Sequence, residues 1–354
     1  MSGRSAAVLA TALLVWVAVD GSKNQNKARP SAAGVQVVPD PANRKVDVLI
    51  GGQPFTAYIY PTTLKKPVLF PLRTAEGNYV TRGFPPGPGE RTDHPHHVGL
   101  WFNYGNVNGI DFWNNSDAIK PQDQGKMGTI MHRGVIATKS GAEKGELEVE
   151  ADWLDPDGKP LLREHTVYVF RGNSKTRSID RITTLTALDR KVTFTDDKEG
   201  VLGLRVTHAL ELPSEKPETF TDASGRTTNV PKADNSLVTG DYLTSEGKHG
   251  DAAWGTRGRW CSLSGRLGQQ PVTVTILDHP KNPGFPTYWH ARGYGLFAAN
   301  PLGEKVLSGG KEELNLSLEP GGSVTFRYRV LILSEPASAE HAEKLYQDFV
   351  TANP

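Results

Sequence analysis

The residue types best able to do chemistry gather in one short segment, Thr92-Asp93-His94-Pro95-His96-His97. Imidazole titrates near neutral pH and also binds metal ions, so the cluster suits either proton transfer or metal ligation. His94 and His96 are two residues apart, and Pro95 disfavours the helical region for His94. On an extended segment these two side chains project to the same side, with His97 opposite. We therefore expect His94 and His96 to face one cavity.

Aromatic, glycine and amide residues follow directly, in segments 99–105 and 108–113. Aromatic rings beside carboxylates and amides are what a sugar site needs, because the rings pack against C–H faces and the polar groups fix the hydroxyls. Such aromatics also build ordinary cores. Asp111 is therefore the stronger functional candidate here, as an orienting or assisting carboxylate, and Trp113 is a candidate contact to substrate.

A second group of candidates lies near the C-terminal end, where Asp278-His279-Pro280 repeats the Asp-His-Pro triplet of the first cluster. His290, Arg292 and Asn300 follow within one stretch. A fixed guanidinium charge beside a histidine suits the binding of a carbonyl, carboxylate or hydroxyl oxygen. Arg205, on a strand-like run between the two groups, is a further candidate for binding substrate.

The elements that must position these residues are short β-rich runs with alternating polarity, which is typical of strands with one buried face. They include segments 46–50, 54–60, 165–170, 272–277 and 324–330. Gly51-Gly52 and segment 155–158 carry hairpin-turn signals. Only segment 339–349 has a helical period, after a candidate cap at Ser338. The pattern predicts an all-β fold, a large antiparallel β-sandwich with a short C-terminal helix.

The N-terminus has the features of an export signal. Arg4 precedes an uncharged apolar run at 6–19, which is shorter than a membrane-spanning helix requires. We expect a signal peptide at 1–21, a flexible leader at 22–34 and a single β-sandwich domain at 35–354, in a periplasmic or secreted protein. A net charge of +1 predicts no nucleic-acid partner, and no later segment is apolar enough to predict integral membrane association.

At these residues the chain resembles the exported bacterial proteins of domain of unknown function 6807 (DUF6807), often labelled the PmoA family. The resemblance covers most of the mature chain. It is carried by DHPHHVGLWFNYGNVNGIDFW (93–113), IMHR (130–133), DKEGVLGLRV (197–206), WGTRGRWC (254–261) and DHPKNPGFPTYWHARGYGLFAANPLG (278–303). Val98 departs from it, because a basic residue often follows the histidine pair in the family.

The resemblance implies a role in polysaccharide breakdown and a fold similar to the galactose-mutarotase-like supersandwich, in which histidines and carboxylates on a sheet face exchange protons with a sugar. It does not imply methane chemistry, because a membrane subunit of a methane monooxygenase needs several spanning helices and this sequence has none.

Three functional hypotheses result. The leading one is a carbohydrate-active hydrolase, lyase or epimerase that uses acid/base chemistry on a sugar. The second is a metal-dependent enzyme in which His94 and His96, with His279 or His290, bind a divalent metal. The third is a non-catalytic glycan-binding protein. The candidate catalytic residues are His94, His96, His97, Asp111 and His290. The candidate substrate-binding residues are Asp93, Trp113, Arg205, Asp278, His279, Arg292 and Asn300.

Overall fold

Alternating burial runs through the strands of the computed structural model, which describes residues 34–215, 217–221, 227–230 and 234–352. In β2 (Lys45–Ile50), for example, Val46, Val48 and Ile50 are buried and the residues between them are partly exposed. Ala33–Pro354 forms one compact unit. The predicted signal peptide and all of the predicted leader except Gly34 lie outside the described residues.

The first large sheet has eight antiparallel strands in the order β1-β2-β3-β4-β5-β11-β18-β17. Its strands are β1 (Val35–Asp40), β2, β3 (Gln53–Ile59), β4 (Val68–Leu69), β5 (Leu100–Tyr104), β11 (Gly200–Arg205), β17 (Tyr288–Ala291) and β18 (Leu296–Asn300). Gly51 and Gly52 both have positive φ, 59° and 76°, in the β2–β3 hairpin turn. This conformation is the one that glycine adopts at least cost in two-residue hairpins.

The second large sheet also has eight antiparallel strands, in the order β14-β15-β16-β20-β9-β8-β7-β6. Its strands are β6 (Thr129–Lys139), β7 (Lys144–Leu154), β8 (Pro160–Gly172), β9 (Thr176–Ala187), β14 (Asp241–Thr244), β15 (Trp260–Leu267), β16 (Gln270–Asp278) and β20 (Ser323–Leu333). Two small two-stranded sheets pair β10 (Val192–Phe194) with β19 (Leu316–Leu318) and β12 (Glu218–Thr221) with β13 (Thr227–Val230).

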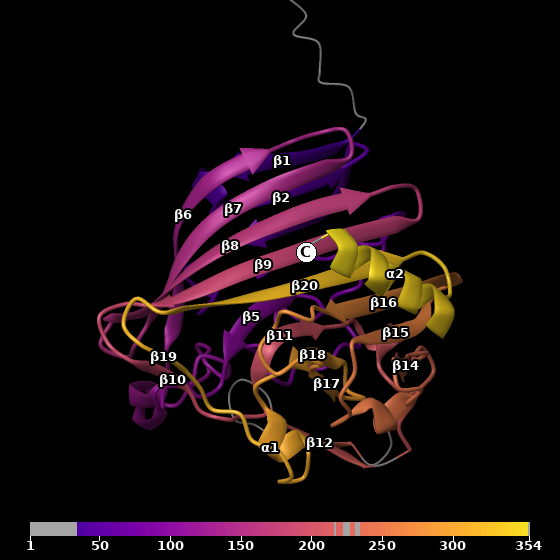
Figure 1. Ribbon diagram of the computed structural model, residues 1–354. Helices are drawn as coiled ribbons and strands as arrows, with labels where there is room; N and C mark the ends of the chain where they lie inside the picture. The colour runs from indigo at the N-terminus through magenta and orange to yellow at the C-terminus, as the bar shows by residue number, and fades with distance from the viewer. Residues whose placement is uncertain (1–33, 216, 222–226, 231–233, 353–354) are drawn as a thin grey trace, which may run out of the picture. The chain divides into compact units, whose positions relative to one another are not determined.

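Helices are few among the described residues. They are α1 (Glu304–Leu307), α2 (Ala339–Ala352) and the 3-10 turns Pro41–Asn43, Pro121–Lys126, His208–Leu210 and Gly250–Ala253. Ser338 caps α2 by accepting a hydrogen bond from the His341 N–H at 3.1 Å. Helix α2 lies on the second sheet beside β15 and β16 (Figure 1). No helix within the described ranges is both long and apolar enough to cross a membrane.

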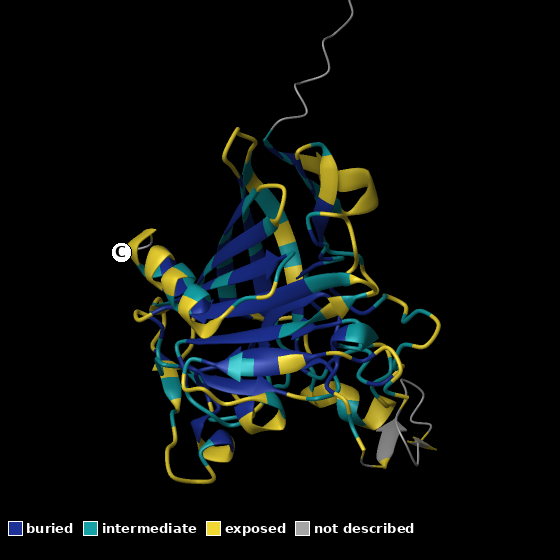
Figure 2. Ribbon diagram, turned by 90° about the vertical axis from the view of Figure 1, so that its right-hand side faces the viewer, coloured by how far each residue is buried: buried dark blue, intermediate teal, exposed yellow. Residues whose placement is uncertain are grey.

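The main core lies between the two large sheets, where Phe102 of β5 packs against Trp153 of β7 and Phe326 of β20. Figure 2 shows the strands largely buried and the connecting loops largely exposed. The single cysteine, Cys261, is buried in this core. The predicted all-β antiparallel sandwich with a C-terminal helix is therefore confirmed.

The other face of the first sheet carries the histidine cluster. Because Phe102 faces the second sheet, its neighbour Trp101 points away from it. Cross-strand pairing places Gly203 opposite both Trp101 and Ala298, and Ala298 opposite His290. This row of β5, β11, β18 and β17 forms the floor on which the segment 92–97 rests.

Candidate functional site

The histidine segment folds as a tight turn. The His97 N–H donates to the His94 carbonyl at 2.9 Å, with Pro95 at the second turn position, where its fixed φ is favoured. His94 has a φ of 47°, an uncommon left-handed conformation for a residue with a side chain. The extended segment predicted from the spacing is therefore wrong. The turn brings His94 against His97, whereas the prediction placed His97 on the opposite side.

Arg82 fixes the backbone of this turn from below. Its buried guanidinium donates to the carbonyls of Arg91, Asp93, His94 and His97 at 3.1, 2.6, 2.9 and 3.0 Å. Four carbonyls on one rigid, planar donor leave the turn little freedom. Arg82 stands between Thr81, which pairs with Val206 in an isolated β-bridge, and Gly83. No motif in the sequence therefore marks its role.

Four aromatic rings stack in a column that starts on the sheet. Trp101 lies over Gly203, where any side chain would clash with its indole ring. His97 stacks on Trp101 with ring centroids 5.1 Å apart, and His94 stacks on His97 at 4.7 Å. Tyr294 covers the other face of His94 at 5.1 Å. His94 is therefore clamped between two rings while its edge stays accessible.

Asp93 orients His94. Its carboxylate accepts a short hydrogen bond from His94 Nδ1, and it also binds Arg205 at 2.8 Å and Arg82 at 3.2 Å. Burial raises the pKa of Asp93, but the bond to His94 and the charge of Arg205 hold it well below its usual range. The carboxylate thus stays ionised. With Nδ1 engaged, Nε2 is the His94 nitrogen left to face a ligand, on a side chain that is 40% exposed.

His96 occupies a different environment. Its Nε2 atom is buried and has no hydrogen-bond partner among the described residues. Burial, together with the charge of Lys66, lowers the pKa of His96 well below its usual value, so the ring is neutral. Lys66 is itself buried and donates to the His96 carbonyl at 2.9 Å. Burial lowers the pKa of Lys66 to about 7.

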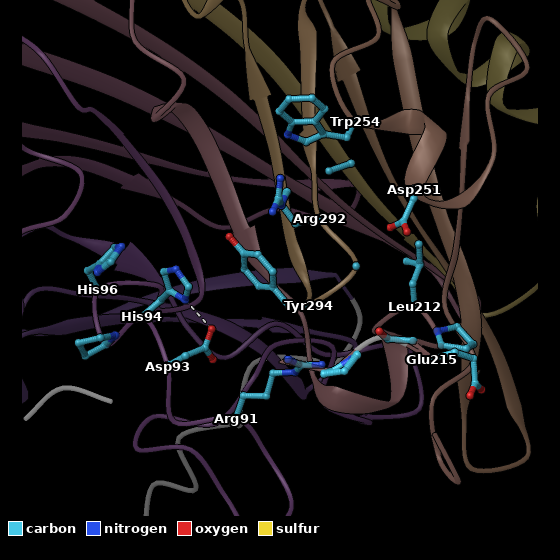
Figure 3. A pocket seen from close by; sticks show the side chains of 16 residues that line it. Arg91, Asp93, His94, His96, Leu212, Glu215, Asp251, Trp254, Arg292 and Tyr294 are labelled. Carbon is cyan, nitrogen blue, oxygen red and sulfur yellow. Dashed lines mark hydrogen bonds and ion pairs between the residues drawn. The ribbon is translucent and has the colours of Figure 1, made fainter. Parts of the chain in front are cut away.

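A pocket of 860 Å³ opens beside His94 (Figure 3). Its walls come from the histidine turn, residues 212–215 and 217, the turn at 251–254 and the β17–β18 hairpin. The side chains that line it are Arg91, Asp93, His94, Pro95, His96, Leu212, Pro213, Ser214, Glu215, Pro217, Asp251, Trp254, Ala291, Arg292, Gly293 and Tyr294. It combines the exposed ring of Trp254 and the partly exposed ring of Tyr294 with charges of both signs, and its volume lies within the range of small-molecule sites.

The structure brings four of the predicted residues, Asp93, His94, His96 and Arg292, to the wall of this pocket. His97 and Arg205 lie directly behind that wall, where Arg205 is fully buried and holds Asp93. These two therefore support His94 and are not in contact with the pocket.

The other predicted residues near the sheet floor have partners of their own. Trp113 is buried edge-on to Trp101 and His97. Asp111 accepts from the backbone N–H groups of Trp113 and Asn114 and so closes a turn. Asn300 donates to the Asp197 carbonyl at 2.9 Å.

His290 lies one residue before the pocket-lining Ala291. Its Nδ1 lies 3.0 Å from the Lys198 carbonyl, and it is buried. Burial and the nearby charge of Lys198 lower the pKa of His290 to about 3, so its imidazole is neutral.

Asp278 and His279 lie elsewhere, at the end of β16 beneath α2. The His279 ring meets Phe349 of α2 edge-on, with centroids 5.3 Å apart. Asp278 accepts from the Asn282 amide at 2.7 Å and the Thr287 N–H at 2.8 Å. The second Asp-His-Pro triplet is thus not brought to the pocket, because strand β16 belongs to the other sheet.

Asp278 gives a pH-dependent prediction. Burial raises its pKa from 3.8 to about 7. The unfolded chain therefore releases this proton first, and the contribution of Asp278 to the free energy of unfolding falls as the pH rises from about 4 to 7. We expect ¹³C NMR of labelled aspartates to show a carboxyl titrating near pH 7 that is absent from Asp278→Asn. Loss of a signal that titrates near pH 4 would contradict the assignment.

The metal-binding hypothesis finds no ligand set in the part of the chain that the structure describes. No group of three or more His, Cys, Asp or Glu side chains there is arranged to hold a metal ion. His94 Nδ1 is committed to Asp93, and the His94 and His96 ring centroids are 5.7 Å apart at 71°.

Sequence reasoning missed Tyr294, Trp254 and Arg91 as pocket residues. Tyr294 and Arg292 share the hairpin Arg292-Gly293-Tyr294-Gly295, so the arginine was a usable pointer to the tyrosine. Trp254 and Arg91 carried no such signal, because their approach to the site depends on loop packing.

Comparison with known proteins gives one family. The model of a "Family of unknown function (DUF6807)" matches residues 45–347. No curated protein matches the sequence.

Several solved structures are similar at low identity. The galactosidase domain of an α-galactosidase-sucrose kinase, AgaSK, is 9% identical with a TM-score of 0.41, covering 86% of this chain and 42% of that chain. A putative aldose 1-epimerase from Escherichia coli K12 is 8% identical with a TM-score of 0.35, covering 85% and 99%. A galactose mutarotase related enzyme from Lactobacillus acidophilus is 9% identical with a TM-score of 0.31, covering 86% and 98%. Likenesses this low transfer neither a substrate nor a reaction.

Proposed function

Since this chain belongs to the DUF6807 family, described only as a family of unknown function, we propose its function from the site: it is an exported carbohydrate-active enzyme in which His94 transfers a proton to or from a sugar. One observation carries the proposal. His94 is held by Asp93 through Nδ1 and clamped between Tyr294 and His97, at the wall of an 860 Å³ pocket.

The Asp93–His94 pair suits general acid/base catalysis. A carboxylate on one imidazole nitrogen fixes the ring orientation and favours the tautomer in which the other nitrogen exchanges a proton. Asp93 stays ionised because His94 and Arg205 stabilise its charge. The left-handed backbone at His94, with its φ of 47°, adds local strain, which native structures retain mainly at functional positions.

A sugar fits the remaining lining. Trp254 is 37% exposed and offers an aromatic surface for the C–H face of a pyranose ring. Asp251 and Glu215 supply carboxylates that can accept hydrogen bonds from hydroxyls. Hydrolysis, elimination and epimerisation of a sugar all require a proton to move at carbon or oxygen, which is the step that His94 would supply in any of these three reactions.

Export is part of the proposal and rests on the apolar run at 6–19. N-terminal sequencing of protein recovered from the periplasm of the native host should begin near residue 22. Recovery in the cytoplasm with Met1 retained would contradict it.

The test of the proposed function is turnover of defined sugars. Purified protein is incubated with panels of glycosides, oligosaccharides and free aldoses in D₂O, and products and deuterium incorporation are followed by NMR. We expect a new product, or exchange of one sugar C–H, with at least one compound. Sugar binding without turnover across the panels would replace the enzyme with a glycan-binding protein. Turnover that requires an added divalent metal would favour the metal-dependent alternative.

A further inference from the structure

Arg292 sits at the tip of a tight hairpin that projects into the pocket. Strand β17 ends at Ala291, and the Arg292 N–H donates to the Leu296 carbonyl at 2.7 Å. The Gly295 N–H donates back to the Arg292 carbonyl at 3.0 Å. The backbone of this arginine is therefore fixed by the sheet, so its side chain starts from a defined position.

Two aromatic rings flank the guanidinium of Arg292. Its central carbon lies 5.7 Å from the ring of Trp254 and 5.7 Å from that of Tyr294. Figure 3 shows the guanidinium between these two rings. Rings attract a cation but accept few of its hydrogen bonds, so they hold the group while its N–H donors stay available.

No protein partner neutralises this charge within the described ranges. The Arg292 side chain makes no ion pair with a described carboxylate and donates no hydrogen bond to a described acceptor. The carboxylate of Asp93 in the same pocket is taken by Arg205 and Arg82. By contrast, Arg91, which also lines the pocket, binds Glu211 at 2.7 Å.

Arg292 lies close enough to Lys198 and His290 for its charge to act on both side chains. Burial lowers the pKa of Lys198 and the charge of Arg292 lowers it further, whereas the charges of Asp197 and Asp111 oppose this shift. Arg292 and Lys198 together also help to lower the pKa of the buried His290. An anion bound at Arg292 would weaken the repulsion between Arg292 and Lys198.

We propose that Arg292 binds an anionic group on the sugar, so that the substrate of this site is an acidic carbohydrate such as a uronic acid residue. The inference rests on the proposed function for the identification of the ligand as a sugar. It adds that this sugar carries a negative charge. A carboxylate suits the group best, because the planar guanidinium offers two parallel donors to its two oxygens. A sulfate ester carries the same charge, and the experiment distinguishes it from a carboxylate by comparing glucose 6-sulfate with glucuronate.

The experiment compares charged and neutral ligands of matched size. Binding of trigalacturonate and galactotriose, and of glucuronate, glucose and glucose 6-sulfate, is measured by titration calorimetry with the full-length mature protein in low salt. We expect at least one acidic member to bind about tenfold or more tighter than its neutral counterpart, the size of effect usual for a hydrogen-bonded charge. Preference for glucose 6-sulfate over glucuronate would assign the anion to sulfate.

Matched variants then test whether Arg292 causes the preference for the acidic sugar. Arg292→Gln should lose it, and Arg292→Lys should keep part of it through its charge. Arg73→Gln serves as the control, because Arg73 also stacks on a tyrosine, Tyr79 at 4.9 Å, but does not line the pocket. Equal binding of charged and neutral sugars, binding of none of these ligands, or a preference that survives in Arg292→Gln overturns the inference.

The two proposals fail separately. Tight binding of an acidic sugar that is never converted, in wild type or variants, supports the Arg292 site and removes the proposed enzymatic function. Conversion of a neutral sugar with no loss in Arg292→Gln supports the enzyme and removes the acidic substrate.

Discussion

Replacing His94 by asparagine is expected to lower kcat by about 100- to 10,000-fold, the usual contribution of a positioned acid or base. Asparagine tolerates the left-handed backbone of this position, and its amide can still contact Asp93, but it cannot exchange a proton. The melting temperature should therefore change little. The measurement is steady-state kinetics on the substrate found by the turnover screen, with thermal unfolding in parallel.

The control for this variant is His165→Asn. His165 is also 40% exposed on its side chain and also pairs with a carboxylate, Glu148 at 2.7 Å, but it lies on β8 outside the pocket. Wild-type kcat is expected for this control. Full activity in His94→Asn, or an equal loss in both variants, would contradict the role of His94.

The second large effect is expected on stability. Arg205 is fully buried and binds Asp93 at 2.8 Å, so Arg205→Met leaves a buried carboxylate with only Arg82 and His94. Breaking one side of a buried pair typically costs about 3 to 5 kcal/mol of unfolding free energy. We expect a loss near the lower end of this range, because Arg82 still binds the Asp93 carboxylate. Urea unfolding at pH 7 measures the loss.

The pH profile separates charge loss from packing loss. Because the pKa of Asp93 is held below its usual value, the ionised carboxylate stabilises the fold above about pH 4, and this contribution is lost as the pH falls further. In Arg205→Met the pKa of Asp93 moves up, so less stability remains to be lost in acid. Arg190→Met is the control, since Arg190 is 46% exposed beside Asp155, and it should change the free energy by less than about 1 kcal/mol. Equal losses in both variants would contradict the buried pair.

The strands were predictable because their signals are local. Alternating burial in segments such as 46–50 follows from the two-residue period of a strand, and Gly51-Gly52 marks a turn that needs positive φ. The helical period at 339–349 and the Ser338 cap likewise depend on neighbours in sequence. The pairing order of the two eight-stranded sheets is set by long-range contacts, and the sequence carries no local signal for it.

The site was predictable in residue type and only partly in geometry. The cluster of His94 and His96 identified the region, but the turn at Pro95 and the left-handed backbone of His94 reversed the expected arrangement of the rings. Arg82 acts on carbonyl groups, which every residue has, so nothing in the sequence marks it. The second Asp-His-Pro triplet led to a wrong prediction. It repeats the sequence of the first triplet, but it lies at the end of a strand in the other sheet and does not reach the pocket.

The most direct measurement is a crystal structure of His94→Asn with the best-binding sugar. The account predicts a sugar in the 860 Å³ pocket, with one of its oxygens or a reacting C–H about 3 Å from the position that Nε2 of His94 holds in the wild type. A sugar bound elsewhere on the protein, or one in the pocket that is turned away from residue 94, would contradict the claim that His94 is the proton-transfer group.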